Sequence, residues 1–159
     1  FFTYFYSMIT LRSATTEDLP VLLEFEQGVV KAERPYNPTL INGEIHYYDL
    51  NFLINSSDAY LIIAEEDNKA IACGYALIRN AEKNYVKFSR YAYLGFMYVD
   101  PEYRGRGINR LILDDLIAWA KGKEISEVRL DVYSENKSAV RAYEKTGFES
   151  LITMMRKEI

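Results

Sequence analysis

The sequence predicts a single domain of the α+β class, and three observations support this prediction. First, the chain has 159 residues, which is about the length of one domain. Second, 49% of the residues are apolar and 14% are aromatic, enough for one sizeable core and too many for an intrinsically disordered chain. Third, segments that alternate apolar and polar residues are interspersed with segments of helical periodicity, without an internal repeat or a linker.

The two periodicities divide the chain into strands and helices. The polar turn at residues 66–69 joins two strand patterns, so the second and third strands are expected to form a hairpin. The expected strands, in chain order, are residues 9–12, 59–65, 70–79, 91–99, 128–132 and 148–157. The expected helices are residues 16–30, 44–54, 107–121 and 138–146.

Local signals place several helix ends. Thr15 is followed three residues later by Asp18, a pattern typical of a helix N-terminus. Pro35 and Pro38 disfavour a helical backbone at the residues before them, so the first helix must end there. Gly147 stands where a glycine in the left-handed conformation commonly ends a helix.

The first eight residues are assigned to an N-terminal extension of uncertain origin, and residues 9–159 to the domain. The aromatic residues 1–7 are too few for a signal peptide and lack its basic region. No apolar run approaches the roughly 18 residues that span a bilayer, so no membrane partner is expected.

Charge and cysteine content exclude several classes of protein. The formal net charge of −4 argues against a nucleic-acid binder, which would need a basic face. Cys73 is the only cysteine, so the chain cannot form an intrachain disulfide, and a cytoplasmic location is expected. Because His46 is the only histidine, a zinc site built from Cys and His is excluded. A metal site built from carboxylates stays open, but no metal is expected. Cys73 lies within a strand pattern, where a small buried hydrophobe is expected.

A glycine-rich segment between a strand and a helix carries the first chemical signal. Residues 103–109 read Tyr-Arg-Gly-Arg-Gly-Ile-Asn and precede an amphipathic helix. The first N–H groups of a helix lack intrahelical partners, and glycines let the backbone approach a ligand closely, so the segment predicts an anion site. Arg104, Arg106 and Arg110 add positive charge. A tight turn with solvated arginines explains the same residues.

Other phosphate-binding motifs match this segment less well. A P-loop would need Lys followed by Ser or Thr after its last glycine. Gly105 and Gly107 match the first two glycines of a dinucleotide-binding fingerprint, but Arg110 stands in place of the third. Asp131, at a strand end, resembles the acidic residue that binds the ribose in that fold.

A second cluster lies at the start of the last predicted helix. Asn136, Ala139 and Tyr143 are spaced by three and four residues, so they project to one side of that helix. A structural explanation makes Asn136 the N-cap, Ala139 and Tyr143 core residues, and Gly147 the C-cap.

Together the two clusters resemble the GNAT superfamily of N-acetyltransferases. The resemblance covers about residues 9–157 in element order, and both motifs follow at the family's spacing. It implies a mixed, mostly antiparallel central sheet with a splayed strand pair and helices on both faces. It also implies acetyl-CoA as the co-substrate, with its pyrophosphate bound by the glycine-rich loop. Arg104 and Gly107 match the family's loop motif, and Asn109 departs from it.

The resemblance also assigns roles to single residues. The strand before the loop is expected to splay from its neighbour and to offer backbone groups to the pantetheine arm. Tyr143 is expected near the thioester sulfur, as the catalytic proton donor. The expected cofactor-binding residues are Met97, Tyr98, Val99, Arg104, Gly105, Arg106, Gly107, Ile108, Asn109, Arg110, Asn136 and Tyr143.

The acceptor side is less defined than the cofactor side. In the family a helix–loop–helix region covers the acceptor, so Glu26, Glu33 and Arg34 are expected to contact it. Glu26, Glu33 and Glu44 are also the candidates for a general base, but each is expected to be a solvated surface charge. His46 is expected to be a surface or half-buried residue without a catalytic role. The open acceptors are an amino acid, a polyamine, an antibiotic, a protein N-terminus and a lysine.

The sequence therefore predicts a cytoplasmic, acetyl-CoA-dependent N-acetyltransferase that moves the acetyl group directly to an amine of a small molecule or peptide. Two alternatives are a non-catalytic acyl-CoA-binding or regulatory module and a nucleotide-dependent oxidoreductase. The excess of aromatic residues, with 14 Tyr and 8 Phe, also points to pocket walls and to a homodimer interface.

Overall fold

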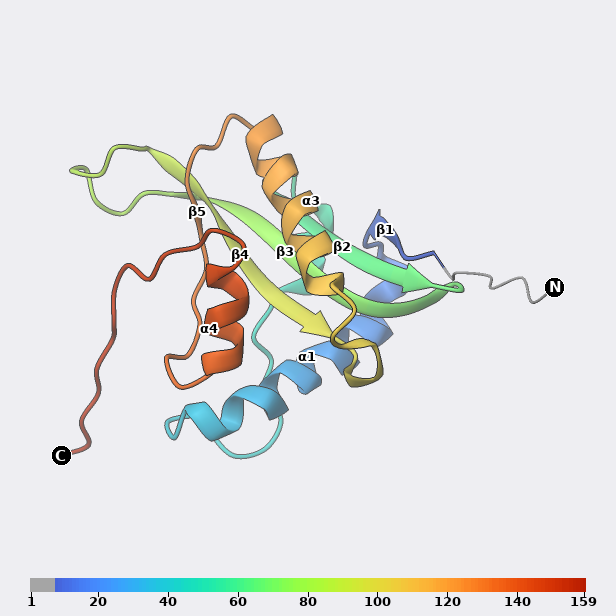
Figure 1. Cartoon of the computed structure of the whole chain (residues 1–159), viewed down its shortest axis with the longest axis horizontal. Coiled ribbons are helices and arrows are strands. Elements are labelled where there is room, and N and C mark those ends of the chain that lie inside the picture. Colours follow the sequence, from blue (N-terminus) through green and yellow to red (C-terminus); the bar gives the residue numbers. More distant parts are fainter. Residues whose placement is uncertain (1–7) are drawn as a thin grey trace.

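The computed structural model describes residues 8–159, so the N-terminal extension expected at residues 1–8 lies outside the described residues except for Met8. Five strands form one open sheet in the order β1-β2-β3-β4-β5 (Figure 1). Neighbouring strands are antiparallel except β4 and β5, which are parallel. The α+β class and the mixed, mostly antiparallel sheet are thereby confirmed. The strands are β1 Thr10–Ser13, β2 Ala59–Glu66, β3 Lys69–Asn80, β4 Arg90–Val99 and β5 Val128–Arg129.

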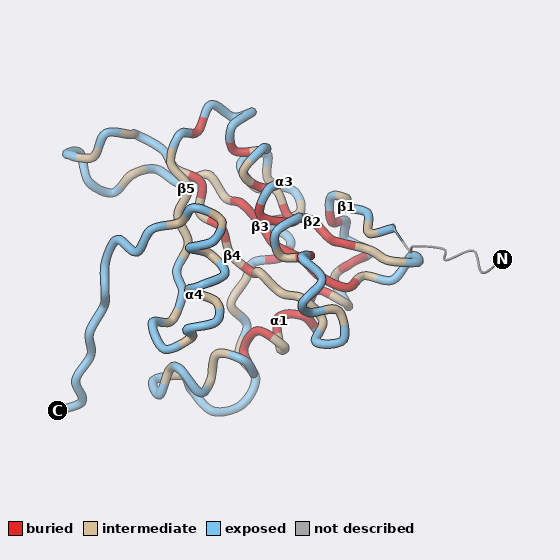
Figure 2. Tube along the Cα trace, in the orientation of Figure 1, coloured by how far each residue is buried: buried red, intermediate tan, exposed pale blue. Residues whose placement is uncertain are grey.

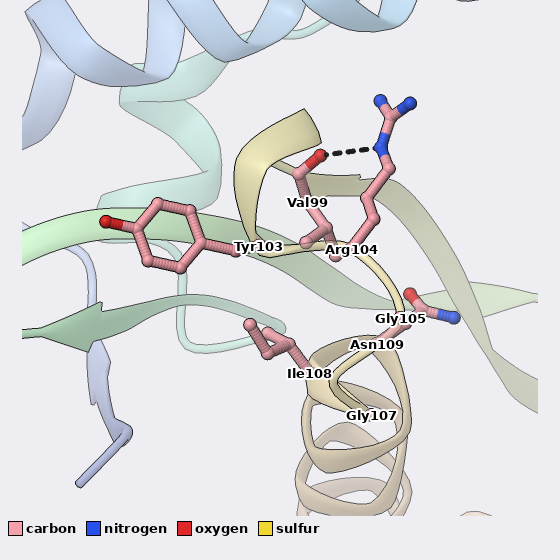
Figure 3. A pocket seen from close by; sticks show the side chains of 7 residues that line it. All are labelled: Val99, Tyr103, Arg104, Gly105, Gly107, Ile108 and Asn109. Atoms are coloured by element: carbon pink, nitrogen blue, oxygen red, sulfur yellow. Dashed lines mark hydrogen bonds between the residues drawn. The ribbon is translucent and has the colours of Figure 1, made fainter. Parts of the chain in front are cut away.

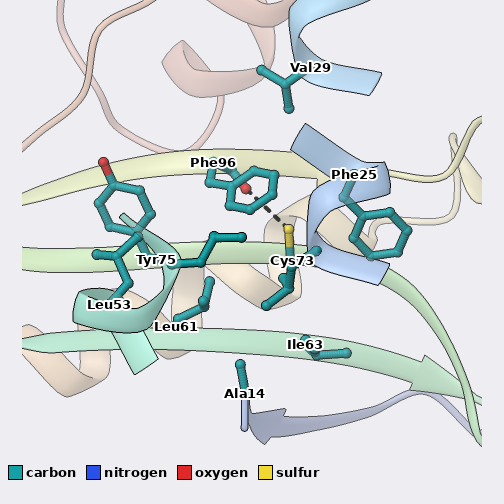
Figure 4. Packing of buried hydrophobic residues seen from close by; sticks show 11 residues of the cluster. Ala14, Phe25, Val29, Leu53, Leu61, Ile63, Cys73, Tyr75 and Phe96 are labelled. Atoms are coloured by element: carbon teal, nitrogen blue, oxygen red, sulfur yellow. Dashed lines mark hydrogen bonds between the residues drawn. The ribbon is translucent and has the colours of Figure 1, made fainter. Parts of the chain in front are cut away.

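Helices cover both faces of the sheet, as expected. Phe25 of α1 and Leu53 of α2 pack with Cys73 and Phe96 on one face (Figure 4). The α3 side chains pack with Ile62 and other residues of the opposite face, so the buried residues of Figure 2 line both sides of the central strands. The helices are α1 Leu19–Glu33, α2 Leu50–Asn55, α3 Ile108–Gly122 and α4 Lys137–Glu144, and the short 3-10 turns are Thr16–Asp18, Arg34–Tyr36 and Pro101–Tyr103.

The predicted hairpin between β2 and β3 is confirmed. Glu66 pairs with Lys69, and the two residues between them, Asp67 and Asn68, have φ angles of 51° and 62°. A two-residue hairpin turn with positive φ at both positions matches the twist of the strands, and Asp and Asn tolerate this conformation better than most residues.

Strand β4 contains a bulge in its second half. Cys73 pairs with Tyr98 and Tyr75 pairs with Gly95, so two residues of β4 lie opposite one residue of β3. Phe96, one of these two, has a φ of 53°. A bulge of this kind leaves a residue without its ladder partner and increases the local twist. The thiol of Cys73 donates a weak hydrogen bond to the Phe96 carbonyl oxygen, at 3.5 Å.

Strands β4 and β5 separate after two paired positions. Ala92 pairs with Val128 and Tyr93 pairs with Arg129. From residue 94 to residue 99, the edge of β4 on this side has no strand partner within residues 8–159. The splayed strand pair is therefore confirmed, and β5 is shorter than the segment 128–132 expected from the sequence.

The helix expected at residues 44–54 is wrong in its first half, because α2 begins only at Leu50. The Glu26 carboxylate accepts hydrogen bonds from the backbone N–H groups of Tyr47, at 2.7 Å, and Tyr48, at 3.0 Å, and so holds this segment in a non-helical conformation. Asp49 then caps α2 by accepting from the Phe52 N–H at 3.0 Å.

The strand expected at residues 148–157 is also wrong. Residues 149–159 have no regular secondary structure and are exposed. Their alternation of apolar and polar residues is that of a strand, but within the described chain no sheet edge pairs with them, and a strand forms only when its backbone groups find a partner. Large apolar side chains are left in solvent, namely Leu151, Ile152, Met154, Met155 and Ile159.

Gly28→Ala is expected to lower the free energy of unfolding by about 1–3 kcal/mol, because the added Cβ would lie 2.5 Å from Cε2 of Tyr98. Alanine in place of glycine within a helix otherwise adds about 1 kcal/mol of stability, so the sign of the change reports the clash. Gly122→Ala is the control, since no atom lies within 4 Å of its added Cβ. Denaturant unfolding measures both variants, and a stabilised Gly28→Ala protein would contradict this contact between α1 and β4.

Candidate functional site

The glycine-rich segment forms a loop that leads from β4 into α3. Asp100 accepts a hydrogen bond from the Glu102 N–H at 3.0 Å and so fixes the turn at the end of β4. Gly105 and Gly107 both have a φ of 77°, a conformation that favours glycine, and Gly107 is the N-cap of α3. An open cavity of about 130 Å³ lies here, and Figure 3 shows its lining residues: Val99, Tyr103, Arg104, Gly105, Gly107, Ile108 and Asn109.

The backbone of this loop presents unused hydrogen-bond donors. Within residues 8–159, the N–H groups of residues 105–110 have no acceptor, and the first loop-to-helix bond runs from the Leu111 N–H to the Gly107 carbonyl oxygen at 3.2 Å. Consecutive free N–H groups at a helix N-terminus carry a partial positive charge and bind anions. Among the described residues, an added Cβ on Gly105 or Gly107 would meet no other atom within 4 Å, so both glycines face open space there.

Two of the three arginines expected to form a positive patch are paired with carboxylates. Arg106 forms a two-point ion pair with Glu66, the last residue of β2, and Arg110 pairs with Asp114 one turn later in α3. Arg104 instead donates through Nε to the Val99 carbonyl oxygen at 3.2 Å (Figure 3). Backbone N–H groups and Arg104 are therefore the donors available to an anion in this loop.

The side chains of the open β4 edge point into the two cores. The Tyr98 ring packs against Phe25 with ring centroids 4.7 Å apart, on the α1 face. The Met97 side chain lies on the opposite face, where its sulfur and Ile112 of α3 crowd the space above Gly74. Since both side chains are committed to packing, a ligand at this edge can use only those backbone groups of residues 97–99 that do not pair with β3, and the Val99 carbonyl oxygen already accepts from Arg104.

Asn136 and Tyr143 lie on α4 as expected, and the structural explanation of their spacing also holds. The Asn136 side-chain oxygen accepts from the Ala139 N–H at 3.3 Å, which makes it the N-cap, and Gly147 ends the helix with a φ of 96°. Tyr143 packs edge-on against Phe148 with ring centroids 5.9 Å apart. Burial, followed by the negative charge of Glu33, raises the pKa of Tyr143 to about 12. N-capping uses the oxygen of Asn136 and leaves its NH₂ group for a ligand.

The expectation that Glu26 is a solvated surface charge is wrong, because its side chain is fully buried. Besides the Tyr47 and Tyr48 N–H groups, its carboxylate contacts Nδ1 of His46 at 2.8 Å. A buried carboxylate is tolerated only when its oxygens are satisfied in this way. These three contacts fix the segment before α2.

His46 lies in this non-helical segment, with an exposed side chain between Glu26 and Glu44. The bond to Glu26, more than the charges of Glu26 and Glu44, raises the pKa of His46 above its usual value. The ion pair therefore supports the segment at low pH and weakens as the pH rises through this raised pKa.

The segment after α1 is tied to the segment after β5. Asn37 donates through Nδ2 to the Tyr133 hydroxyl at 2.9 Å, and the Tyr36 and Tyr133 rings stack with centroids 6.2 Å apart. Arg34 donates to the carbonyl oxygens of Ile41 and Gly43, so its guanidinium braces this segment. No sequence motif had marked Tyr36, Asn37 or Tyr133 as part of a site, although the excess of tyrosines had indicated pocket walls.

Glu33 lies at the C-terminal end of α1 and is half-buried. Burial raises the pKa of its carboxyl group, and the neighbouring Tyr47 hydroxyl partly opposes the shift. Within residues 8–159, no three Asp, Glu, His or Cys side chains gather in a metal-binding group. In that same part of the chain, no helix has the length and apolarity to cross a membrane.

Comparison with known proteins decides the family. The model of the acetyltransferase (GNAT) family matches residues 27–148, more than half of the chain. The chain belongs to the GNAT acetyltransferase family. The resemblance stated from the two sequence motifs is thereby confirmed.

Three relatives show how the GNAT fold extends over the chain. An uncharacterised N-acetyltransferase of Methanocaldococcus jannaschii is 30% identical over 145 residues, which are 88% of this chain and 60% of that protein, so the chain spans less than two thirds of that relative. The N-alpha-acetyltransferase RimI of Mycobacterium tuberculosis is 26% identical over 141 residues, covering 89% of this chain and 78% of that protein. A predicted acetyltransferase of Clostridium acetobutylicum, solved with acetyl-CoA, has a TM-score of 0.73 at 24% identity and covers 95% of this chain and 96% of its own.

The GNAT family uses acetyl-CoA, and the residues of this chain fit that molecule. The free N–H groups of residues 105–110 suit a pyrophosphate, and the open edge of β4 leads directly to them.

Gly107→Glu is expected to weaken acetyl-CoA binding at least tenfold, because a carboxylate beside the free N–H groups repels and replaces a phosphate. Gly107→Gln is the matched control: it brings the same left-handed strain and nearly the same size without the charge. Titration calorimetry measures binding and circular dichroism verifies folding. Equal affinities of the two variants would show that charge at this position plays no part.

Proposed function

We propose that this chain is an acetyl-CoA-dependent N-acetyltransferase that transfers the acetyl group directly to an amine of a small molecule or peptide. The observation that carries the proposal is the continuity of two features: the unpaired edge of β4 ends where the free N–H groups of the loop begin. An extended, polar arm with a pyrophosphate at one end is the ligand that this combination of sheet edge and helix N-terminus fits.

Each part of the site has a task in this reaction. The N–H groups of residues 105–110 bind phosphate oxygens, together with Arg104, and the backbone of residues 97–99 pairs with the amide groups of the pantetheine arm. An N–H group freed from the ladder at the Phe96 bulge donates to the carbonyl oxygen as negative charge develops on it. The NH₂ group of Asn136 is available to hydrogen-bond the arm from the α4 side. Acetyl-CoA, when bound, supplies the activated acetyl group.

Tyr143 is the group that we assign to the departing sulfur. Its pKa of about 12 lies above the value of about 8.5 that is typical of a thiol, so complete transfer of its proton is uphill. Tyr143 therefore acts first as a hydrogen-bond donor whose bond to sulfur strengthens as the C–S bond breaks. Such stabilisation is specific to the transition state and raises the rate.

Transfer without an acyl-enzyme intermediate is supported by the state of Cys73. Its side chain is fully buried, and burial raises the pKa of its thiol well above the usual range. Because the thiolate is the nucleophilic form, a buried neutral thiol cannot take up an acetyl group. A chain that uses no disulfide also suits a reducing compartment, which supports the cytoplasmic location that we propose.

The activity is tested by mixing the protein with acetyl-CoA and a panel of amines: amino acids, a polyamine, an aminoglycoside, lysine and short peptides with free N-termini. Steady release of free CoA that depends on the amine supports the proposed function. Tight binding of acetyl-CoA by calorimetry without any release would assign the chain to the binding or regulatory modules instead.

Tyr143→Phe is expected to lower kcat by roughly 10²–10⁴-fold, the usual contribution of a proton donor, while acetyl-CoA affinity changes little because the ring packing is kept. Tyr85→Phe, in an exposed side chain, is the control with the same loss of a hydroxyl. Release of CoA at saturating substrates measures kcat. A Tyr143→Phe protein that turns over like the wild type would make Tyr143 a packing residue only.

We also propose that two copies associate through the C-terminal segment 149–159. Its apolar side chains include Ile152 and Met154, which are 90% and 95% exposed, and exposed apolar clusters of this kind mark interaction surfaces. The double variant Ile152→Lys, Met154→Lys is expected to convert a dimer into a folded monomer. Light scattering after size-exclusion chromatography measures the mass, and a monomeric wild type would refute this association.

A further inference from the structure

The end of α1 brings a carboxylate to the open side of the sheet. Glu33 is the last residue of α1, and the C-terminal end of a helix carries a partial negative charge that favours a cation beside it. Within residues 8–159 no Lys, Arg or His lies within ion-pair distance of Glu33. Arg34, its neighbour in the chain, donates instead to the carbonyl oxygens of Ile41 and Gly43. The half-buried carboxylate is left without a counterion.

The groups around Glu33 come from both faces of the sheet. Tyr48 stacks on Phe96 with ring centroids 4.3 Å apart, so the segment before α2 lies directly over the bulge of β4. The charge of Glu33 acts on the phenols of Tyr47 and Tyr48 in that segment, and on Tyr143 of α4.

Tyr143 packs with the core on the α3 side, whereas α1 covers the opposite side. Glu33 and Tyr143 can approach each other where β4 and β5 separate, because no strand pairs with residues 94–99 on that side within the described chain. Asn37 and Tyr133 hold the two sides together at this place, at 2.9 Å. Glu33 and Tyr143 therefore flank the position where the open β4 edge would present the thioester.

We propose that Glu33 is the general base of the reaction, and that its carboxylate accepts a proton from the ammonium group of the acceptor; this inference rests on the proposed function. The ammonium group of an alkyl amine has a pKa near 10.4 and carries no lone pair for attack at neutral pH. A carboxylate at the end of α1, without a counterion and beside the segment that covers the bulge, attracts the cation and removes its proton.

Protons and electron pairs balance over the whole transfer. Glu33 takes the first proton, and the lone pair so freed on nitrogen forms the N–C bond to the acetyl carbonyl. The electron pair of the breaking C–S bond stays on sulfur, which receives a proton from Tyr143. The nitrogen loses a second proton, which restores Tyr143, and Glu33 returns its proton to solvent. The products are the neutral amide and the neutral thiol, with one proton released.

The two residues are electrostatically coupled in the direction that the reaction needs. The negative charge of Glu33 contributes to the raised pKa of Tyr143. That contribution vanishes when Glu33 becomes neutral, so Tyr143 becomes a stronger acid after the amine has lost its proton. Burial also brings the pKa of Glu33 closer to neutrality, where a base is more effective. Tyr47, Tyr48, Tyr143 and Arg34 are the titratable groups around Glu33.

The test compares Glu33→Gln with the wild type on two acceptors: the most active alkylamine of the panel and its β,β-difluorinated analogue. The analogue has nearly the same shape, but its ammonium group is far more acidic, so it needs less help from a base. Glu33→Gln is expected to lower kcat/KM by roughly 10²–10⁴-fold at pH 7 for the alkylamine and by less than about tenfold for the analogue. The loss in kcat/KM for the alkylamine is expected to shrink as the pH approaches the pKa of its ammonium group, because more of the amine is then neutral. Glu24→Gln, an exposed carboxylate on α1, is the matched control.

The outcomes separate this proposal from the proposed function. Equal losses for the two amines at every pH, or no loss, would overturn the role of Glu33 as a base while the acetyltransferase activity stands. Absence of CoA release from the wild type with every amine would overturn the activity and, with it, this proposal. Thermal unfolding and acetyl-CoA calorimetry on the same variants are expected to match the wild type. If Glu33→Gln fails either measurement, Glu33→Asp replaces it, and we expect partial activity with a larger loss for the alkylamine than for the analogue. A loss of equal size for both amines would overturn the role of Glu33.

Discussion

The arrangement of strand β4 determines most of the structure, because β4 pairs with a strand along one edge and is left without one along part of the other. It must pair with β3 along its length to belong to the sheet, yet its other edge must remain without a strand beyond residue 94. The bulge at Phe96 reconciles these two requirements: an extra residue on β4 opposite Gly74 adds local twist, and a strand that twists in this way turns away from a straight neighbour. An unpaired edge normally invites other strands, but this one lies inside the molecule, flanked by helices.

On the α1 side of the sheet, the buried Glu26 carboxylate holds the segment that covers the bulge. Placing a charge in the core is unfavourable unless hydrogen bonds compensate it, and here two backbone N–H groups and His46 do so. In return the segment before α2 is held close to α1, and Tyr48 is placed over Phe96. A helix over residues 44–54 would have used those N–H groups internally. The position of the segment before α2 therefore depends on one carboxylate.

The sequence predicted the sheet, the hairpin, the glycine-rich loop before α3 and the N-cap of α4, because each depends on local signals: alternation, turn residues, glycines and caps. Tertiary contacts decided the parts that it missed. The helical periodicity of residues 44–49 was overruled by Glu26, a residue some twenty positions earlier in the chain, and no local pattern marks that bond. The apolar pattern of residues 148–157 was a strand pattern without an available edge. Likewise, the arginines of the loop looked like a positive patch until the fold placed Glu66 beside Arg106.

The same pairing of distant residues explains why Glu33 and Tyr143 are hard to connect from sequence. They are separated by most of the chain and belong to helices on opposite faces of the sheet, yet the charge of Glu33 contributes to the raised pKa of Tyr143. Spacing rules describe neighbours on one element, so they identified Tyr143 with Asn136 on α4 but gave Glu33 no partner.

The reactivity of the Cys73 thiol reports whether the centre of the sheet is folded. The thiol is fully buried and donates to the carbonyl of the bulge, so thiol-specific reagents reach it only when β3 and β4 come apart. In an assay of the proposed activity, a dye that reacts with thiols would therefore report free CoA and not the folded protein. Conversely, slow labelling of Cys73 in the absence of substrates measures how often the centre of the sheet opens, at the bulge on which the site is built.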